Sequence, residues 1–467
     1  MPLLSQDEAL ARARRIVEAS PAGETEVTLD GVVDRFVRFA DCGPTQSADR
    51  ERCDVAVRVR VGTPGVDARE ARASSGSLDE GALRAALERA LALAQASPPD
   101  PELAPLGGPV DVAETALQRP TMDHTFREKV RWVEHALART RERELFPAGL
   151  IETSGMTRTI VNSAGRAVHG ERSRAAFSLT ASSGVDSGLA AGSGFGAAIA
   201  SNVEDIDPGR VVERATRKAV ASRDPVAIEP GEYTVVLEPA AVGALLLFTG
   251  YRGFGARELE EKGSFLCGRL GRRAFSAGLS IRDDAAHEVY PGFLFDGEGS
   301  PRRRTALVER GELRGPVTDA RWAKRLGIAN TGHARPQPSA RGPAPENLVV
   351  APGDASLEEL VAGVERGLLV TQLHCTSMIE PLGLTLTGTT RNGTFLIEDG
   401  SLAAPVRNLR FTQSLVEALG RVRRVGREPE VAGAPFSGEI VCPALCIDGF
   451  RFTSTTDLRA PALSSRP

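Results

Sequence analysis

The chain has 467 residues, of which 41% are hydrophobic, 25% charged and 5% aromatic, which is ordinary for a soluble globular protein of about two to four domains. Its formal net charge of −4 is close to neutral for this length, which argues against a protein dedicated to binding nucleic acid.

Cysteine usage and the start of the chain predict a cytoplasmic protein. The six cysteines are too scattered for a disulfide framework, so we expect reduced thiols. The first residues, Met-Pro-Leu-Leu-Ser-Gln-Asp-Glu, lack the basic start and apolar run of a signal peptide. No stretch approaches the roughly 18 continuous apolar residues of a membrane span, so no membrane association is expected.

The first elements of the chain alternate between helix and strand. Residues 7–20 show helical spacing of apolar side chains, and residues 26–39 and 54–61 alternate as strands do. A second helix opens near Leu78 and ends before the prolines at 98–101.

A similar order then recurs at an offset of about 120 residues. It comprises a helix over 123–144, strands over 158–162, 167–169 and 174–182, a Gly/Ala/Ser-rich stretch over 184–200 and a helix over 208–222. The recurrence predicts an internal duplication: two α/β units, at about 1–105 and 120–228, within an N-terminal half of residues 1–228.

After Pro225 the sequence becomes rich in strands and turns, which predicts a large curved antiparallel β domain over residues 229–467. Asn392-Gly393 predicts a hairpin turn. Ser356 and Glu359 have the spacing of a capping box. Residues 334–346 are too rich in proline for regular structure. The fold class is therefore predicted to be α+β.

Residues 240–275 carry the most specific pattern. An apolar helix start runs into a charged end, followed by Lys262-Gly-Ser-Phe and by Gly268-Arg-Leu-Gly. This layout resembles the TldD/PmbA family, the metallopeptidases once called modulators of DNA gyrase. Similar stretches lie at 283–284, 295–302, 305–319, 323–327, 331–333, 347–371, 387–400 and 406–411. The resemblance is dense over 230–455 and looser over 25–225.

The resemblance also locates the family's metal positions. In the zinc-bearing branch, a His-Glu-x-x-x-His motif precedes the Lys-Gly-Ser by about a dozen residues. Counted back from Lys262, the two His positions fall on Phe248 and Gly253, and the Glu position falls on Thr249. The family's Cys ligand would fall near Pro429, where there is no cysteine. The resemblance therefore implies that this chain lacks the zinc ligands, so no cofactor is expected and no catalytic residue is identified.

Three histidines and one arginine run outside the metal helix also carry possible chemistry. His287, His333 and His374 are the remaining donors for a rebuilt metal site. Cys375 lies beside His374, but neighbours on a strand point to opposite faces, which favours a core thiol over a Cys–His pair. The run Arg302–Arg304 favours a solvated strand edge over an anion site.

The resemblance implies a role. The family's zinc-bearing members trim peptides inside a closed dimer chamber that a metal-free partner completes. We therefore predict a metal-free, TldE/PmbA-like subunit that binds an extended peptide by strand addition and assists proteolysis by a zinc-bearing partner. The alternatives are a stand-alone metallopeptidase with a rebuilt metal site and a homodimeric peptide-binding or regulatory protein. Whether the chain is itself an enzyme, which residues bind peptide and whether the dimer is homo- or heteromeric stay open. Direct contact with nucleic acid is not expected.

Overall fold

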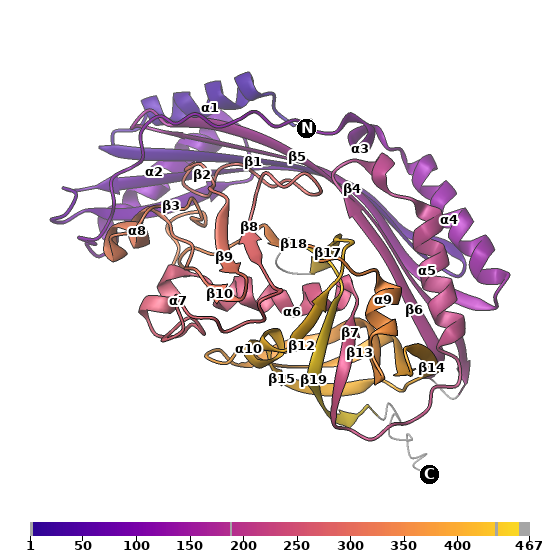
Figure 1. The fold of residues 1–467 in the computed structure, drawn as a ribbon. Coiled ribbons are helices and arrows are strands. Elements are labelled where there is room, and N and C mark those ends of the chain that lie inside the picture. Colours follow the sequence, from indigo (N-terminus) through magenta and orange to yellow (C-terminus); the bar gives the residue numbers. More distant parts are fainter. Residues whose placement is uncertain (1–2, 187–188, 435–437, 457–467) are drawn as a thin grey trace, which may run out of the picture.

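The computed structural model describes residues 3–186, 189–434 and 438–456. Long strands of the N-terminal half form a sheet in the order β3-β2-β1-β4-β5-β6, with every neighbouring pair antiparallel. The strands are β1 (Glu24–Ala40), β2 (Gly43–Val61), β3 (Arg69–Ser75), β4 (Leu145–Asn162), β5 (Ala167–Asp186) and β6 (Leu189–Ala200). Figure 1 shows this sheet arching over the C-terminal half of the molecule.

The order helix, three strands, helix occurs twice in this half. The helices are α1 (Gln6–Glu18), α2 (Glu80–Ala96), α4 (Phe126–Arg141) and α5 (Pro208–Ala221). The short α3 (Arg119–Asp123) precedes α4, and the short η1 (Val203–Asp205) lies between β6 and α5. The sequence predicted only a strand pair in the first unit. It missed β3, and it missed β6 because small residues there mask the alternation. The division of the chain after residue 228 stays a prediction.

The two faces of this sheet differ in chemistry. Val27, Leu29 and Val57 are buried in an apolar cluster beneath α1 and α2, and a separate apolar cluster lies beneath α4 and α5. Glu26 and Arg58 alternate with them and are also buried, but they point to the other face. The helix-covered face is therefore apolar, whereas the inner face presents charge to the C-terminal half.

The C-terminal half contains two sheets. The first includes β7 (Glu232–Leu237), β12 (Arg366–Glu380), β13 (Thr385–Glu398), β14 (Ser401–Pro405), β15 (Leu409–Ser414), β16 (Val422–Val425) and β19 (Leu445–Thr455). Because β12 pairs with both β7 and β13, the path β12-β7-β19-β15-β13 closes into a ring. The second sheet holds β8 (Ile281–Asp283), β9 (Thr305–Glu309), β10 (Glu312–Leu313), β11 (Leu348–Val350), β17 (Glu430–Ala434) and β18 (Gly438–Cys442).

Most of these pairings are antiparallel, but β7 with β12 and β11 with β18 are parallel, which the sequence did not predict. The helices of this half are α6 (Pro239–Arg252), α7 (Ala256–Glu260), α8 (Ala320–Leu326), α9 (Leu357–Ala362) and α10 (Leu415–Gly420). The predicted α+β class is confirmed. No helix in the described ranges has both the length and the apolarity to cross a bilayer.

Two local predictions concern the capping box at Ser356 and the hairpin turn at Asn392-Gly393. The capping box of Ser356 and Glu359 is confirmed at the start of α9. The hairpin turn at Asn392-Gly393 is wrong, because β13 runs straight through it. Both residues have positive φ at an irregularity in the β12–β13 pairing, so this dipeptide forms a bulge. The chain reverses instead at Asp399-Gly400, between β13 and β14.

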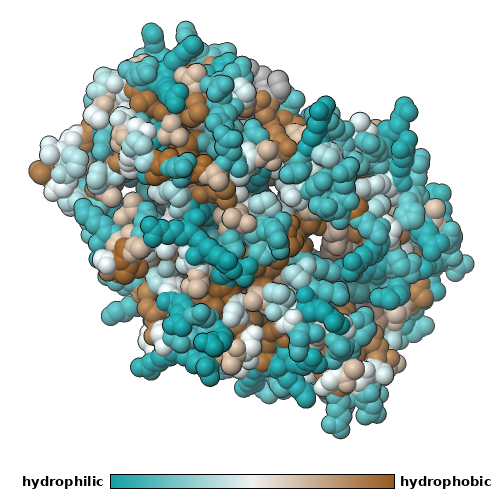
Figure 2. All heavy atoms as spheres, turned by 45° about the horizontal axis from the view of Figure 1, so that its top comes forward, coloured by the Kyte–Doolittle hydropathy of each residue, from teal (hydrophilic) through white to brown (hydrophobic). Residues whose placement is uncertain are grey.

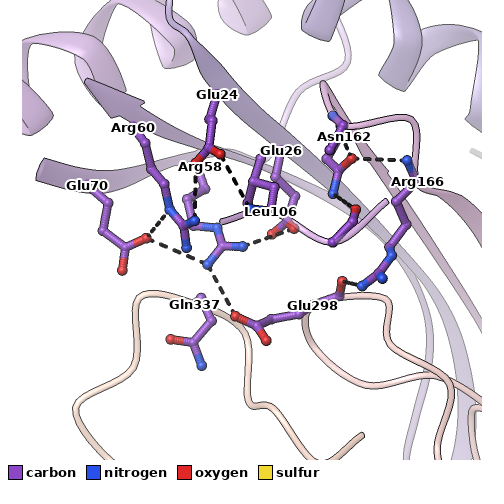
Figure 3. Close-up of polar contacts among 12 residues, drawn as sticks. Glu24, Glu26, Arg58, Arg60, Glu70, Leu106, Asn162, Arg166, Glu298 and Gln337 are labelled. Atoms are coloured by element: carbon purple, nitrogen blue, oxygen red, sulfur yellow. Dashed lines mark hydrogen bonds and ion pairs between the residues drawn. The ribbon is translucent and has the colours of Figure 1, made fainter. Parts of the chain in front are cut away.

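The two halves meet through buried ions (Figure 3). Arg58 of β2 donates to Glu26 Oε2 at 3.0 Å, and its Nη1 lies 3.7 Å from Glu298 Oε1 of the C-terminal half. Arg166 donates to the Glu298 backbone oxygen at 2.8 Å. Burial raises the pKa of the Glu298 carboxyl to about 7. The seam between the halves therefore contains buried polar contacts here, beside a buried apolar cluster of Ile160, Val168 and Phe295.

Candidate functional site

A cleft of about 870 Å³ lies between the two halves, bounded by α6, β12, β17 and the inner face of β4, β5 and β6. We call it the α6 cleft. Figure 2 shows apolar side chains gathered along a furrow near the middle of the displayed face, with a small opening beside them. Helix α6 starts at Pro239, where the missing backbone N–H removes no hydrogen bond of the helix. One stripe of side chains on this helix faces the cleft. The stripe consists of Ala240, Ala244, Leu247, Phe248 and Tyr251.

The resemblance assigns the family's metal motif to Phe248, Thr249 and Gly253, and these three residues do not share one face of α6. Phe248 is half-buried on the cleft wall. Thr249 is fully buried and donates its hydroxyl to the Leu246 carbonyl at 2.6 Å. Gly253 ends the helix, where an added Cβ would lie 2.5 Å from both the Phe265 ring and the Thr249 oxygen. Two of the three positions are thus packed away from the cleft.

Strand β12 offers a free edge to this cleft. Its parallel pairing with β7 stops at Val370, opposite Leu237, after which the chain of β7 leads into α6. Residues 371–376 continue along the cleft wall. Within the described residues no strand pairs with that edge of β12 beyond Val370. An extended peptide can therefore add there as a strand, next to the apolar stripe of α6.

The wall opposite α6 is charged but internally paired. Arg174 of β5 donates to Glu439 Oε1 at 2.7 Å and lies 3.0 Å from Glu152 Oε2. Burial lowers the pKa of the Arg174 guanidinium. Glu439 and Glu152 together outweigh burial, so the pKa of Arg174 lies above its usual value. Sequence reasoning missed this network because its members lie on three strands, with Arg174 and Glu439 265 positions apart. Polar residues at alternate strand positions were the only available signal.

Two further ion pairs lie at one end of the cleft. Arg214 of α5 binds Glu430 through both carboxylate oxygens, at 2.7 and 2.5 Å. Lys218 pairs with Glu238, which precedes α6, and Thr371 donates to Glu238 at 3.4 Å. Burial lowers the pKa of the Lys218 ammonium, and Glu238 acts in the opposite direction. Each of these four charges is therefore compensated by a partner.

The prediction of a core thiol at Cys375 is wrong. Cys375 is exposed and lines the cleft together with His374. The alternation fails because the β12–β13 register shifts here and Cys375 takes a positive φ of 49°. His374 Nε2 lies 2.9 Å from Arg391 Nη1. Burial lowers the pKa of the His374 imidazole, and the positive charge of Arg391 lowers it further. His374 is thus engaged by Arg391 rather than by the thiol.

The other metal-site candidates are dispersed. His333 is fully buried, with Nε2 3.0 Å from Asp283 Oδ1. Arg302 donates to the same oxygen at 2.7 Å and is itself buried, so the predicted solvated strand edge is wrong at Arg302, although Arg304 is exposed. His287 lies outside this cluster and, like His333, does not line the α6 cleft. His333 serves a buried structural network.

The residues of the α6 cleft do not fit a zinc ion. Across the part of the chain that the structure describes, no three His, Cys, Asp or Glu side chains gather as metal ligands would. Phe248, Thr249 and Gly253 supply no zinc donor. Cys442 donates its S–H to the Pro239 carbonyl, and burial raises the pKa of this thiol well above its usual range. That environment keeps the sulfur protonated rather than ready for a metal.

Known proteins place the chain in a family. The profile of the PmbA/TldA metallopeptidase C-terminal domain matches residues 230–454, and that of the PmbA/TldA metallopeptidase central domain matches residues 123–223. The chain belongs to the TldD/PmbA family. The resemblance predicted from residues 240–275 is thereby confirmed.

Relatives within the TldD/PmbA family carry protease names. A metalloprotease of Methanothermobacter thermautotrophicus is 28% identical over 57% of this chain and 59% of its own length. A zinc metalloprotease TldD homolog of Saccharolobus solfataricus is 29% identical over 42% and 44%. The chain thus spans only about half the length of these curated relatives. The crystal structure of TldE from Thermococcus kodakarensis shares the fold, with a TM-score of 0.84 and 22% identity over 96% of this chain and 99% of that one.

Proposed function

We propose that this chain is a metal-free, TldE/PmbA-like subunit that holds an extended peptide in the α6 cleft and assists its cleavage by a zinc-bearing partner subunit. The observation that carries the proposal is the contrast on α6. The helix still forms one wall of a large cleft, yet its three metal-motif positions are Phe248, Thr249 and Gly253.

The shape of the cleft supports peptide binding. The apolar stripe of α6 offers contact to side chains, while the unpaired edge of β12 offers backbone donors and acceptors. An extended peptide uses both at once, because alternate side chains point toward and away from the surface beneath it. The charged wall adds no free catalytic carboxylate, since Glu152 and Glu439 are both held by Arg174.

The rebuilt-metallopeptidase alternative gains no support from the geometry. The His333 imidazole contacts the Asp283 carboxylate, and the His374 imidazole contacts the Arg391 guanidinium. A homodimeric peptide-binding protein would share the cleft but would need no zinc-bearing partner, so partner dependence separates it from the proposal.

Binding is tested with fluorescein-labelled casein peptides and the purified chain. Ala244→Trp places a large ring on the cleft-facing stripe, and we expect peptide affinity to fall about tenfold or more. Ala11→Trp, on the exposed face of α1, is the matched control and should leave affinity unchanged. Equal peptide affinity for both variants and the wild type would remove the α6 cleft as the binding site.

Partner dependence is tested by co-expression with a paralogue that carries the His-Glu-x-x-x-His motif. Co-purification of the two chains, and cleavage of the peptides only when both are present, is the expected result. Cleavage by the paralogue alone at the same rate would leave this chain without the assisting role.

A further inference from the structure

A second groove adjoins the α6 cleft. It has a volume of about 880 Å³ and lies between α5, strand β14 and the start of α9. We call it the β14 groove. Its lining includes Arg214, Glu238, Pro239 and Glu430, which also line the α6 cleft. The two spaces are therefore neighbours, and the Arg214–Glu430 and Lys218–Glu238 ion pairs stand where they meet.

One wall of the β14 groove is an open sheet edge. β14 (Ser401–Pro405) pairs with β13 on one side only. The other side receives one backbone bond among the described residues, from Val226 N–H to the Pro405 oxygen at 2.9 Å. Since Ser401 faces Glu398 across the two-residue turn, the backbone N–H and C=O of Leu402 point away from β13. Residues 401–404 thus form a short, unprotected edge beside the groove.

The floor of the groove is apolar. Ala355, Leu369, Phe395 and Ala444 belong to one buried cluster and line the space. Leu402 is 50% exposed at its rim. An extended chain on β14 can therefore place alternate side chains on this floor while its backbone pairs with the strand.

The facing wall carries two arginines that form no ion pair among the described residues. Arg210, Arg214 and Arg217 follow the i, i+4, i+7 spacing of one face of α5 and line the groove. Arg214 is held by Glu430, but the exposed Arg210 and Arg217 make no side-chain hydrogen bond or ion pair among the described residues. Of the acidic lining residues, Glu213 is bound by Arg143 at 2.8 Å, while Glu358 lies near Arg217 and Glu428 near Arg214.

We propose that the β14 groove is a second peptide site, which takes the continuation of the peptide held in the α6 cleft as an added strand on β14. A carboxylate of that peptide, from an acidic side chain or a free C-terminus, contacts Arg210 and Arg217. This inference rests on the proposed peptide-binding function and extends it to an acidic, longer substrate.

The test compares two fluorescein-labelled probes cut from one extended acidic sequence, about six and about fourteen residues long, so that only the longer can span both spaces. With the full chain, fluorescence anisotropy should show the long probe binding about tenfold tighter than the short one. Arg210→Glu with Arg217→Glu should abolish that advantage and leave the short probe unchanged. Leu402→Pro, which removes the outward N–H, should also reduce it, whereas Leu402→Ala should retain most of it.

The outcomes separate the two proposals. Equal affinity of the long and short probes, or a length advantage that survives in the arginine variants, would overturn the β14 site and leave the α6 cleft standing. Failure of both probes to bind would overturn both. A long probe with an amidated C-terminus, and one with Glu replaced by Gln, identify the source of the carboxylate. If neither change weakens binding, the role of the arginines is refuted.

Discussion

The two walls of the α6 cleft differ in a way that explains what the site can do. The α6 wall is apolar, and its metal-motif positions carry no group that binds zinc or moves a proton. The opposite wall is rich in charge, but Arg174 holds Glu152 and Glu439. One wall thus offers apolar contact, and the carboxylates of the other wall are ion-paired. Under the proposed function, the cleft binds a peptide and leaves its cleavage to the partner subunit.

The largest effect should come from breaking the charged wall. Arg174→Ala leaves two largely buried carboxylates without their shared cation, and we expect a loss of about 3 kcal/mol in the free energy of unfolding. Arg321→Ala, at the more exposed pair with Asp100 between the same halves, should cost less than about 1 kcal/mol. Chemical denaturation of both variants checks this. Equal losses would mean that the Arg174 network is no more than a surface contact.

A smaller effect is expected on the apolar wall, where α6 ends. Gly253→Ala places a Cβ 2.5 Å from the Phe265 ring and should cost about 2 kcal/mol. Gly81→Ala, in α2 with open space around it, should be neutral or stabilising by up to about 1 kcal/mol. Thermal unfolding compares the two substitutions. A Gly253→Ala variant as stable as the wild type would show that this position has room for a ligand side chain.

The seam that joins the halves should respond to pH. The folded state raises the pKa of Glu298 from 4.5 to about 7 because burial disfavours the carboxylate. The folded state therefore binds this proton more tightly, and stability falls as pH rises from about 4.5 to about 7. Glu298→Gln removes that dependence.

We therefore expect Glu298→Gln to gain stability over the wild type at pH 8 relative to pH 5, by about 2 kcal/mol. Asp296, whose pKa burial raises to about 6, interacts with Glu298, so the difference between the two pH profiles reports the titration of this pair. Parallel melting-temperature profiles for the two proteins from pH 5 to pH 8 would show that Glu298 is ionised throughout.

The sequence predicts the parts of this molecule that depend on local pattern. Helical spacing located α1, α4 and α5 to within a few residues, and strict alternation located the last part of β2, residues 54–61. The family resemblance drew attention to the segment that forms α6, but it did not predict which of its residues line a cleft. Both rest on residues close together in the chain.

What the sequence could not predict depends on distant or irregular contacts. Arg174 and Glu439 meet only because two sheets fold against each other. Cys375 reaches the cleft because a bulge with positive φ breaks the strand alternation. The sequence predicted Arg302 at a solvated strand edge, but its side chain is buried in an ion pair with Asp283. In each case the position of the side chain depends on a contact distant in sequence or on an irregular backbone conformation.

The central claim is that this chain holds peptide without cleaving it. The most direct measurement incubates the purified chain with unfolded casein peptides and added zinc, with and without a chelator, and determines bound metal by elemental analysis. The account predicts peptide binding with no stoichiometric zinc and no cleavage unless the zinc-bearing paralogue is added. Chelator-sensitive cleavage by this chain alone, with one zinc per chain, would contradict it.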